Sequence, residues 1–158
     1  GELDHVYDKH HPVPGEPAIA GTEPMPLYED ETLGRVSGAI CYDYDFPQLG
    51  LDHAAQDVDL VALPASDWRG IDPIHTQMAS IRAIEGGHSL VRSTRFGLSA
   101  GFDAYGRARG WLSAFDDGGA QQERGDDFQA AGGAIHSTFG GSDVVKSRCA
   151  LVRRRRSA

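Results

Sequence analysis

The sequence predicts an α/β fold, in which strands and helices alternate along the chain and pack in layers. Two observations carry this prediction. A mostly apolar run over residues 58–63 stops at Pro64, as is typical of a buried strand. A longer segment after Asp72 has the apolar spacing and the end signals of a helix. With 158 residues, the chain has about the length of one domain and can bury a hydrophobic core.

The first elements follow from proline positions and apolar runs. Residues 1–34 contain five prolines, which exclude a helix through most of this segment. We expect an extended loop there, with a short strand near residues 4–7. A strand is predicted over 35–41, and Pro47 is suited to the first turn of a helix over 47–56.

The clearest helix begins after Asp72, which is the expected cap, and Pro73 suits its first turn. Two glycines at 86–87 are expected to end it. Its predicted buried face consists of apolar residues three or four positions apart: Ile74, Met78, Ile81 and Ile84. Strands are then expected over 89–94, 97–103 and 110–115, the last two joined by a turn at 105–107.

The composition changes after about residue 117, where Gly, Gln, Asp, Ser and Arg dominate without apolar periodicity. We therefore expect a domain over 1–117 and a tail of low order over 118–158. The net charge of −8 argues against a nucleic-acid partner, because neutralising phosphates needs a basic surface. No stretch is long and apolar enough to span a bilayer, and two cysteines do not form a disulfide framework.

Cys41 is the most informative single residue. It lies at the end of the predicted strand over 35–41, where open α/β sheets place their chemistry. The other cysteine, Cys149, lies in the predicted tail. Asp43 and Asp45 follow closely, and like charges raise a thiol pKa, so we expect a thiol that is mostly neutral at rest.

Three segments together resemble the carbon–nitrogen hydrolase (nitrilase) superfamily. YDKHHPVPGE at 7–16 is similar to the family's lysine segment, and GAICYD at 38–43 with the following Phe46 and Pro47 resembles its nucleophile elbow. SDWRG at 66–70, followed by HTQM at 75–78 and RAIE at 82–85, is similar to the loop and helix after the nucleophile. This last segment, with GLSAGFD at 97–103, is most like the apolipoprotein N-acyltransferase branch.

The resemblance implies a nitrilase-type four-layer α-β-β-α sandwich, of which the chain holds the C-terminal part and lacks the N-terminal part. It implies acyl transfer through a thioester on Cys41, to water or to an amine. Lys9 and the backbone N–H of Tyr42 would stabilise the oxyanion. Glu16 matches a second acid that orients the lysine or the substrate. No organic cofactor or metal is implied.

Further roles are implied for residues around the nucleophile. Asp43 stands where the acyltransferase branch has an acid, although it could equally cap the following turn. Trp68 and Asp67 are expected to contact the substrate. The family also uses a glutamate base well before the lysine, and only eight residues precede Lys9, so Glu2 does not match it. The chain is therefore expected to carry the lysine and the cysteine without that base.

The implied partners depend on the branch. An N-acyltransferase would take a phospholipid acyl group to a lipoprotein N-terminus and be membrane-associated through segments outside this chain. A small-amide hydrolase would be cytoplasmic. An inactive fragment that needs a partner, or a homo-oligomer, is also compatible with the sequence.

Two other mechanisms fit isolated residues. GLSAG at 97–101 matches a serine elbow, with Asp116 and His136 following in order, but a strand and turn come after Ser99 instead of a helix. The second is a metal site, although no pair of its histidines has the helical spacing of a zinc enzyme. Its candidate ligands are His5, His10 and His11, with His53, His75 or His88.

Overall fold

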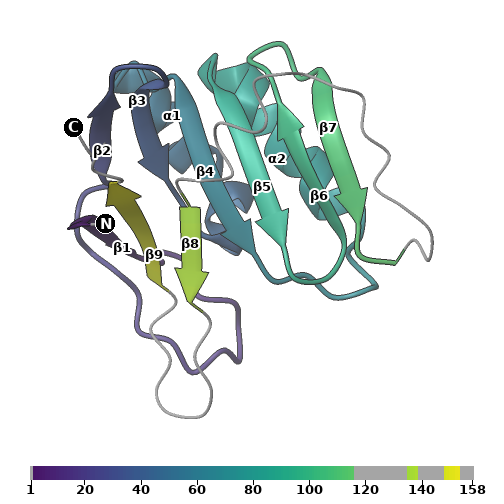
Figure 1. Cartoon of the computed structure of the whole chain (residues 1–158). Coiled ribbons are helices and arrows are strands. Elements are labelled where there is room, and N and C mark those ends of the chain that lie inside the picture. Colours follow the sequence, from purple (N-terminus) through teal and green to yellow (C-terminus); the bar gives the residue numbers. More distant parts are fainter. Residues whose placement is uncertain (1, 116–134, 139–147, 154–158) are drawn as a thin grey trace.

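The computed structural model describes residues 2–115, 135–138 and 148–153, and most of its strands belong to one mixed sheet (Figure 1). This six-stranded sheet has the order β2-β3-β4-β5-β6-β7. Strands β3, β4 and β5 are parallel, and the other neighbours are antiparallel. The strands are β2 (Leu27–Asp30), β3 (Gly34–Gly38), β4 (Leu60–Ala65), β5 (Ser89–Thr94), β6 (Leu98–Phe102) and β7 (Ala108–Ser113).

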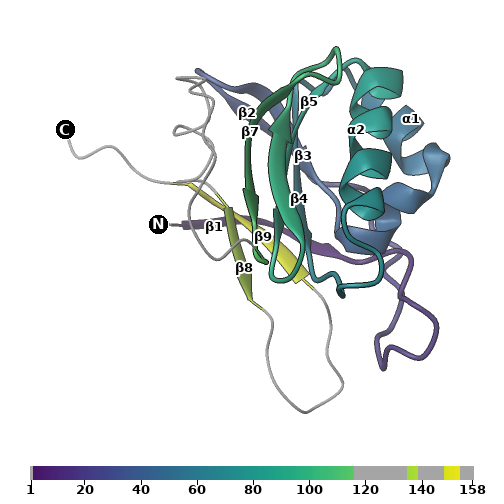
Figure 2. The ribbon, with the colours of Figure 1, turned by 90° about the vertical axis from the view of Figure 1, so that its right-hand side faces the viewer.

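Helices α1 (Pro47–Ala55) and α2 (Ile74–Gly86) cover one face of this sheet, as Figure 2 shows. On the other side lies a three-stranded sheet with the order β1-β9-β8 (Figure 2). It consists of β1 (Glu2–Asp8), β9 (Arg148–Arg153) and β8 (Ile135–Thr138), all antiparallel. This layered arrangement of strands and helices confirms the α/β prediction.

Local signals place most elements within two residues of their expected bounds. Pro47 is the first residue of α1, and all six residues of β4 are buried, as expected for a central parallel strand. Strand β2 was not expected. Strands β8 and β9 lie within the predicted tail, and because the rest of 118–158 is outside the described residues, the division at residue 117 stays a prediction.

The predicted buried face of α2 is wrong for three of its four residues, and the fourth, Met78, is half-buried. Ile74, Ile81 and Ile84 are about half exposed, and the residues that face the sheet are His75, Thr76, Ala79 and Ala83. Small alanines allow the helix to approach the sheet closely, and buried polar groups are tolerated where they find hydrogen bonds. Thr76 Oγ1, for example, donates to the carbonyl oxygen of Leu98 at 2.7 Å.

The predicted cap of α2 is also wrong. Pro73 occupies the N-cap position, and Asp72 instead accepts a hydrogen bond from the backbone N–H of Leu98, at 2.7 Å. The other end follows the prediction, because Gly87 adopts the left-handed conformation, with φ of 67°, and caps the helix. Within the described residues, the longest and most apolar helices fall short of what crossing a bilayer needs.

Candidate active site

Cys41 lies just beyond β3, at the start of the 3₁₀ helix η1 (Cys41–Asp45). The strand ends at Gly38, earlier than the predicted 35–41. Cys41 has φ of +51°, which is uncommon for a residue with a side chain and marks a sharp turn of the backbone. Its side chain is buried and packs with Tyr7, Met25 and Ala65.

The lysine segment forms a closed loop after β1. Lys9 is only 3% exposed, and its Nζ donates to Glu16 Oε2 at 2.8 Å. The same carboxylate oxygen accepts the backbone N–H of Val13 at 3.0 Å. Glu16 therefore holds the Lys9 side chain in place, and the catalytic roles of both residues stay predictions.

Asp43 joins this loop to the nucleophile turn. Its buried carboxylate accepts hydrogen bonds from the Tyr7 hydroxyl at 2.9 Å, the His11 N–H at 2.7 Å and the Ile40 N–H at 3.0 Å. A fully buried carboxylate needs such partners to remain charged. The bond to Ile40 closes the turn that carries Cys41, and the other two hold the chain on either side of Lys9.

The environment of the Cys41 sulfur mixes opposing effects. Burial raises the pKa of the thiol above its usual range. The polar Ser66 backbone and the positive charges of Lys9 and Arg92 act against that rise, whereas Asp67 adds to it. A neutral resting thiol was expected from Asp43 and Asp45, but the physical cause is burial.

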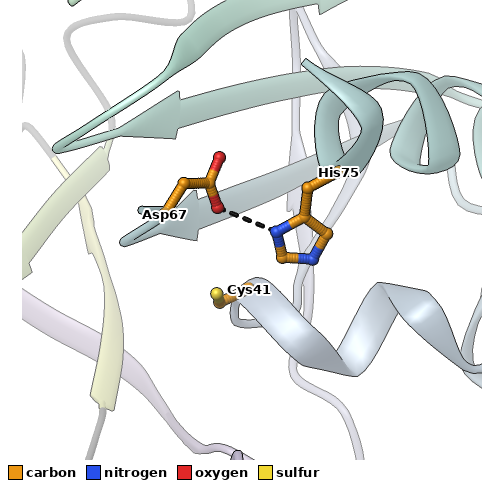
Figure 3. Close-up of side chains that lie close together, drawn as sticks. All are labelled: Cys41, Asp67 and His75. Atoms are coloured by element: carbon orange, nitrogen blue, oxygen red, sulfur yellow. Dashed lines mark hydrogen bonds and ion pairs between the residues drawn. The ribbon is translucent and has the colours of Figure 1, made fainter. Parts of the chain in front are cut away.

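His75, Asp67 and Cys41 lie close together at the end of β4, as Figure 3 shows. His75 Nδ1 is 2.8 Å from Asp67 Oδ1, and its Nε2 is 2.7 Å from Asp45 Oδ1. Arg92 Nη2 donates to the same Asp67 oxygen at 2.7 Å. Cys41, Asp67, His75 and Arg92 are all buried.

These contacts determine the charges of the cluster. Burial opposes the charged form of His75, but the hydrogen bonds to Asp45 and Asp67 outweigh it and raise its pKa to about 9. Burial likewise opposes ionisation of Asp67, and the hydrogen bonds from His75 and Arg92 hold its pKa below the usual value. The cluster therefore contains an imidazolium and a carboxylate at neutral pH.

The donor atoms of Cys41, Asp67 and His75 lie within 4.8 Å of one another, a separation that could suit a metal ion. Both ring nitrogens of His75 already face carboxylates, and Arg92 Nη2 lies 3.1 Å from Nδ1. A cation at these donors would displace a proton and stand beside a guanidinium group. We therefore interpret Asp67 and His75 as part of an ion-pair network with Asp45 and Arg92 beside Cys41, and not as metal ligands.

The remaining candidate residues differ in exposure. Trp68 is 55% exposed on the loop after β4, whereas its neighbour Asp67 is buried in the network. Tyr42, directly after the nucleophile, packs edge-on against Phe46, with ring centroids 5.2 Å apart. The roles of Trp68 and Asp67 in contacting the substrate, and of the Tyr42 N–H, stay predictions.

The histidines proposed as metal ligands occupy separate places. His53 and His88 lie in a separate buried cluster on the helix-covered face of the six-stranded sheet. There His53 Nδ1 and His88 Nε2 contact the Tyr44 hydroxyl, at 2.6 and 3.2 Å. His10 binds the Glu23 carbonyl in the loop after β1, and the side chain of His5 is outside the described residues. Among the histidines whose side chains the structure describes, His75 lies beside Cys41, and His11 Nδ1 lies 3.3 Å from Asp43 Oδ1.

The serine alternative lacks its expected local structure. Ser99 lies inside β6, and its hydroxyl accepts the backbone N–H of Thr94 at 3.0 Å. No strand–turn–helix elbow surrounds it among the described residues. Asp116 and the side chain of His136 are outside the described residues.

Sequence analysis missed the roles of His75 and Arg92. His75 was part of the HTQM motif and one of the candidate metal ligands, without a role at the nucleophile, and Arg92 lies in a predicted strand. The signal that could have pointed to these roles is the presence of a histidine and an arginine on the helix and strand expected to pack near the nucleophile. Asp45, which contacts His75, is 30 positions away from it in the sequence, so spacing alone gives no sign of the contact.

Residues 1–115 match the model of the carbon-nitrogen hydrolase family, and the chain therefore belongs to that family. Members of this superfamily are enzymes, including N-acyltransferases and amidases. The predicted superfamily and the likeness to the N-acyltransferase branch are thereby confirmed.

Among individual proteins, the chain resembles apolipoprotein N-acyltransferases. It is 33% identical over 87 residues to that of Pseudomonas aeruginosa, covering 53% of this chain and 17% of the relative. It is 34% identical over 98 residues to that of Azotobacter vinelandii, covering 60% and 19%. The chain thus spans less than a fifth of the length of these relatives.

Among solved structures, the fold resembles the amidase from Nesterenkonia sp. AN1. One structure, a variant with the acetamide moiety of fluoroacetamide added covalently at its active-site cysteine, has a TM-score of 0.55 at 24% identity. It covers 60% of this chain and 39% of the amidase. A second amidase structure has a TM-score of 0.56 at 20% identity and covers 72% and 49%. This likeness confirms the α/β fold of the nitrilase superfamily over part of the domain.

Proposed function

We propose that the chain carries out acyl transfer through a thioester on Cys41. The observation that carries this proposal is the position of Cys41: a buried thiol on a turn with positive φ, between the Lys9 loop and the end of β4. The thiolate would attack a carbonyl carbon and form a C–S bond. The leaving group would depart with a proton, and water or an amine would then break the thioester.

In this mechanism Lys9 and the Tyr42 N–H stabilise the oxyanion. The 2.8 Å bond to Glu16 supports this role, because it keeps the ammonium group fixed before the substrate arrives. Asp43 holds the lysine loop against the nucleophile turn. Asp67 and Trp68 lie at the end of β4 and are proposed to face the substrate, with Trp68 as its apolar wall.

The acyl donor is proposed from the relatives. The likeness to apolipoprotein N-acyltransferases favours a phospholipid donor and the amino terminus of a lipoprotein as acceptor. The alternative is hydrolysis of a small amide, which the fold of the Nesterenkonia amidase makes reasonable. The two differ in the donor that acylates Cys41.

Mass spectrometry of the full chain tests this function. Incubation with phospholipid vesicles, or with a short aliphatic amide, should add one acyl group that hydroxylamine removes, as it does from a thioester. Cys41→Ala should abolish the adduct, and Cys149→Ala is the matched control that should keep it. An acyl group that survives Cys41→Ala would contradict the mechanism.

A second measurement tests the oxyanion site. Lys9→Ala should slow formation of the adduct by about 100-fold, the usual loss for one oxyanion donor. An adduct that forms but does not turn over would favour the inactive fragment that needs a base from elsewhere.

A further inference from the structure

The Asp45–His75–Asp67 bridge connects two segments that both contact the nucleophile. Asp45 is the last residue of η1, the short helix that Cys41 begins. Asp67 lies just after β4, and the donor atoms of Cys41, Asp67 and His75 lie within 4.8 Å of one another. His75, from α2, contacts both carboxylates at 2.7 and 2.8 Å.

Acid–base catalysis by His75 does not fit these contacts. A histidine base needs one ring nitrogen free to accept a proton. Both nitrogens of His75 face carboxylate oxygens, which only accept hydrogen bonds, so both nitrogens carry protons. The cluster therefore differs from a Cys-His-Asp triad, despite having the same three residue types.

The bridge also balances charge beside the thiol. The negative charge of Asp67 raises the pKa of Cys41, and Arg92 opposes this effect. His75 and Arg92 both bind the same oxygen of Asp67, so two cationic groups offset one buried carboxylate. Without His75, Asp67 would keep only one of these partners.

We propose that His75 is a positioning residue for Cys41, holding η1 and the segment after β4 together so that the Cys41 sulfur stays beside the buried Asp67–His75 pair. His75 does not touch the substrate in this assignment. It acts through Asp45 on the turn that carries the nucleophile, and through Asp67 on the segment that lies beside the sulfur. The inference rests on the proposed function, in which Cys41 is the nucleophile.

The test is the rate of alkylation of Cys41 by iodoacetamide as a function of pH, in the full chain carrying Cys149→Ala. His75→Ala should raise the midpoint of the profile by about one unit and lower the rate at neutral pH by about tenfold. His75→Asn places an amide N–H near the position of Nδ1 and should recover part of the loss through Asp67. Gln77→Ala, on the exposed face of the same helix, is the matched control and should leave the profile unchanged.

A purely structural role for His75 predicts the opposite result. Loss of packing would expose the thiol, lower its pKa toward the ordinary value and speed alkylation. An unchanged or faster reaction in a folded His75→Ala variant overturns the proposal. If both His75 variants fail to fold, Asp45→Asn weakens one end of the bridge only, and an unchanged profile there overturns it equally.

This measurement also separates the inference from the proposed function. Alkylation reports the thiol itself and needs no acyl donor. If no acyl-enzyme forms on the wild-type chain, the proposed function fails while the effect of His75 on the thiol is still measured. If the acyl-enzyme forms but the alkylation rate of Cys41 is the same with and without His75, the inference alone fails.

Discussion

Acid should destabilise this protein through His53, which is fully buried between β3 and the helical layer. Its Nε2 lies 2.9 Å from Ser37 Oγ, and its Nδ1 lies 2.6 Å from the Tyr44 hydroxyl. Burial, with a smaller contribution from the nearby His88, lowers the pKa of His53 from 6.5 to about 3. The ring is therefore neutral in the fold and is protonated more readily after unfolding.

The lowered pKa of His53 determines the direction and the size of the stability loss in acid. Between pH 6.5 and about 3 the unfolded chain binds one more proton at His53, so stability is complete above pH 6.5 and falls as the pH decreases. The expected loss is about 1.4 kcal/mol for each pH unit. The whole shift corresponds to about 5 kcal/mol, a large part of the stability of an ordinary domain.

Urea unfolding followed by tryptophan fluorescence, repeated across this pH range, measures the effect. His53→Gln keeps a donor and an acceptor but cannot be protonated, so its unfolding free energy should depend less steeply on pH. His10→Gln, in the loop after β1, is the control and should retain the wild-type slope. Equal slopes for the wild type and His53→Gln would refute the argument.

Three further predictions concern other parts of the molecule. Asp43→Asn replaces one of the two carboxylate oxygens that accept hydrogen bonds from Tyr7, His11 and Ile40 with an NH2 group, so at least one of these donors loses its acceptor. The change should cost about 2 kcal/mol in urea unfolding, with loss of the acyl-enzyme. Ile81→Ser, on the exposed face of α2, should change stability by less than about 0.5 kcal/mol, whereas Ala83→Leu should overpack the buried face and cost about 1–3 kcal/mol; the reverse order would show that the helix faces are exchanged. The pKa of His75 is raised from 6.5 to about 9, so its contribution is complete below pH 6.5 and should disappear between pH 6.5 and 9. Urea unfolding of His75→Asn should lack this alkaline loss, and a persisting loss would assign it elsewhere.

Local chemistry made much of the fold predictable. Pro47 begins a helix, Gly87 ends one, and the apolar run up to Pro64 forms a buried strand, because each signal acts within a few residues. The Lys9 and Cys41 segments could be found for the same reason. Each is a short continuous motif whose residue types are needed at consecutive positions.

The faces of α2 show where such signals fail. Isoleucines at helical spacing were expected to face the sheet, yet Ala79 and Ala83 do so and Ile81 is 46% exposed. Hydrophobic spacing identifies an apolar stripe on a helix but does not say which partner covers it. Close approach of the helix to the sheet favoured the small residues.

The sequence by itself determined the α/β class, the family, and the pairing of a lysine loop with a cysteine turn. Only the tertiary structure decided what surrounds the thiol. Asp45, Asp67, His75 and Arg92 come from η1, the loop after β4, α2 and β5, and they meet because parallel strands and a covering helix bring these segments together. Contacts between distant segments depend on this packing, and no local pattern in the chain encodes them.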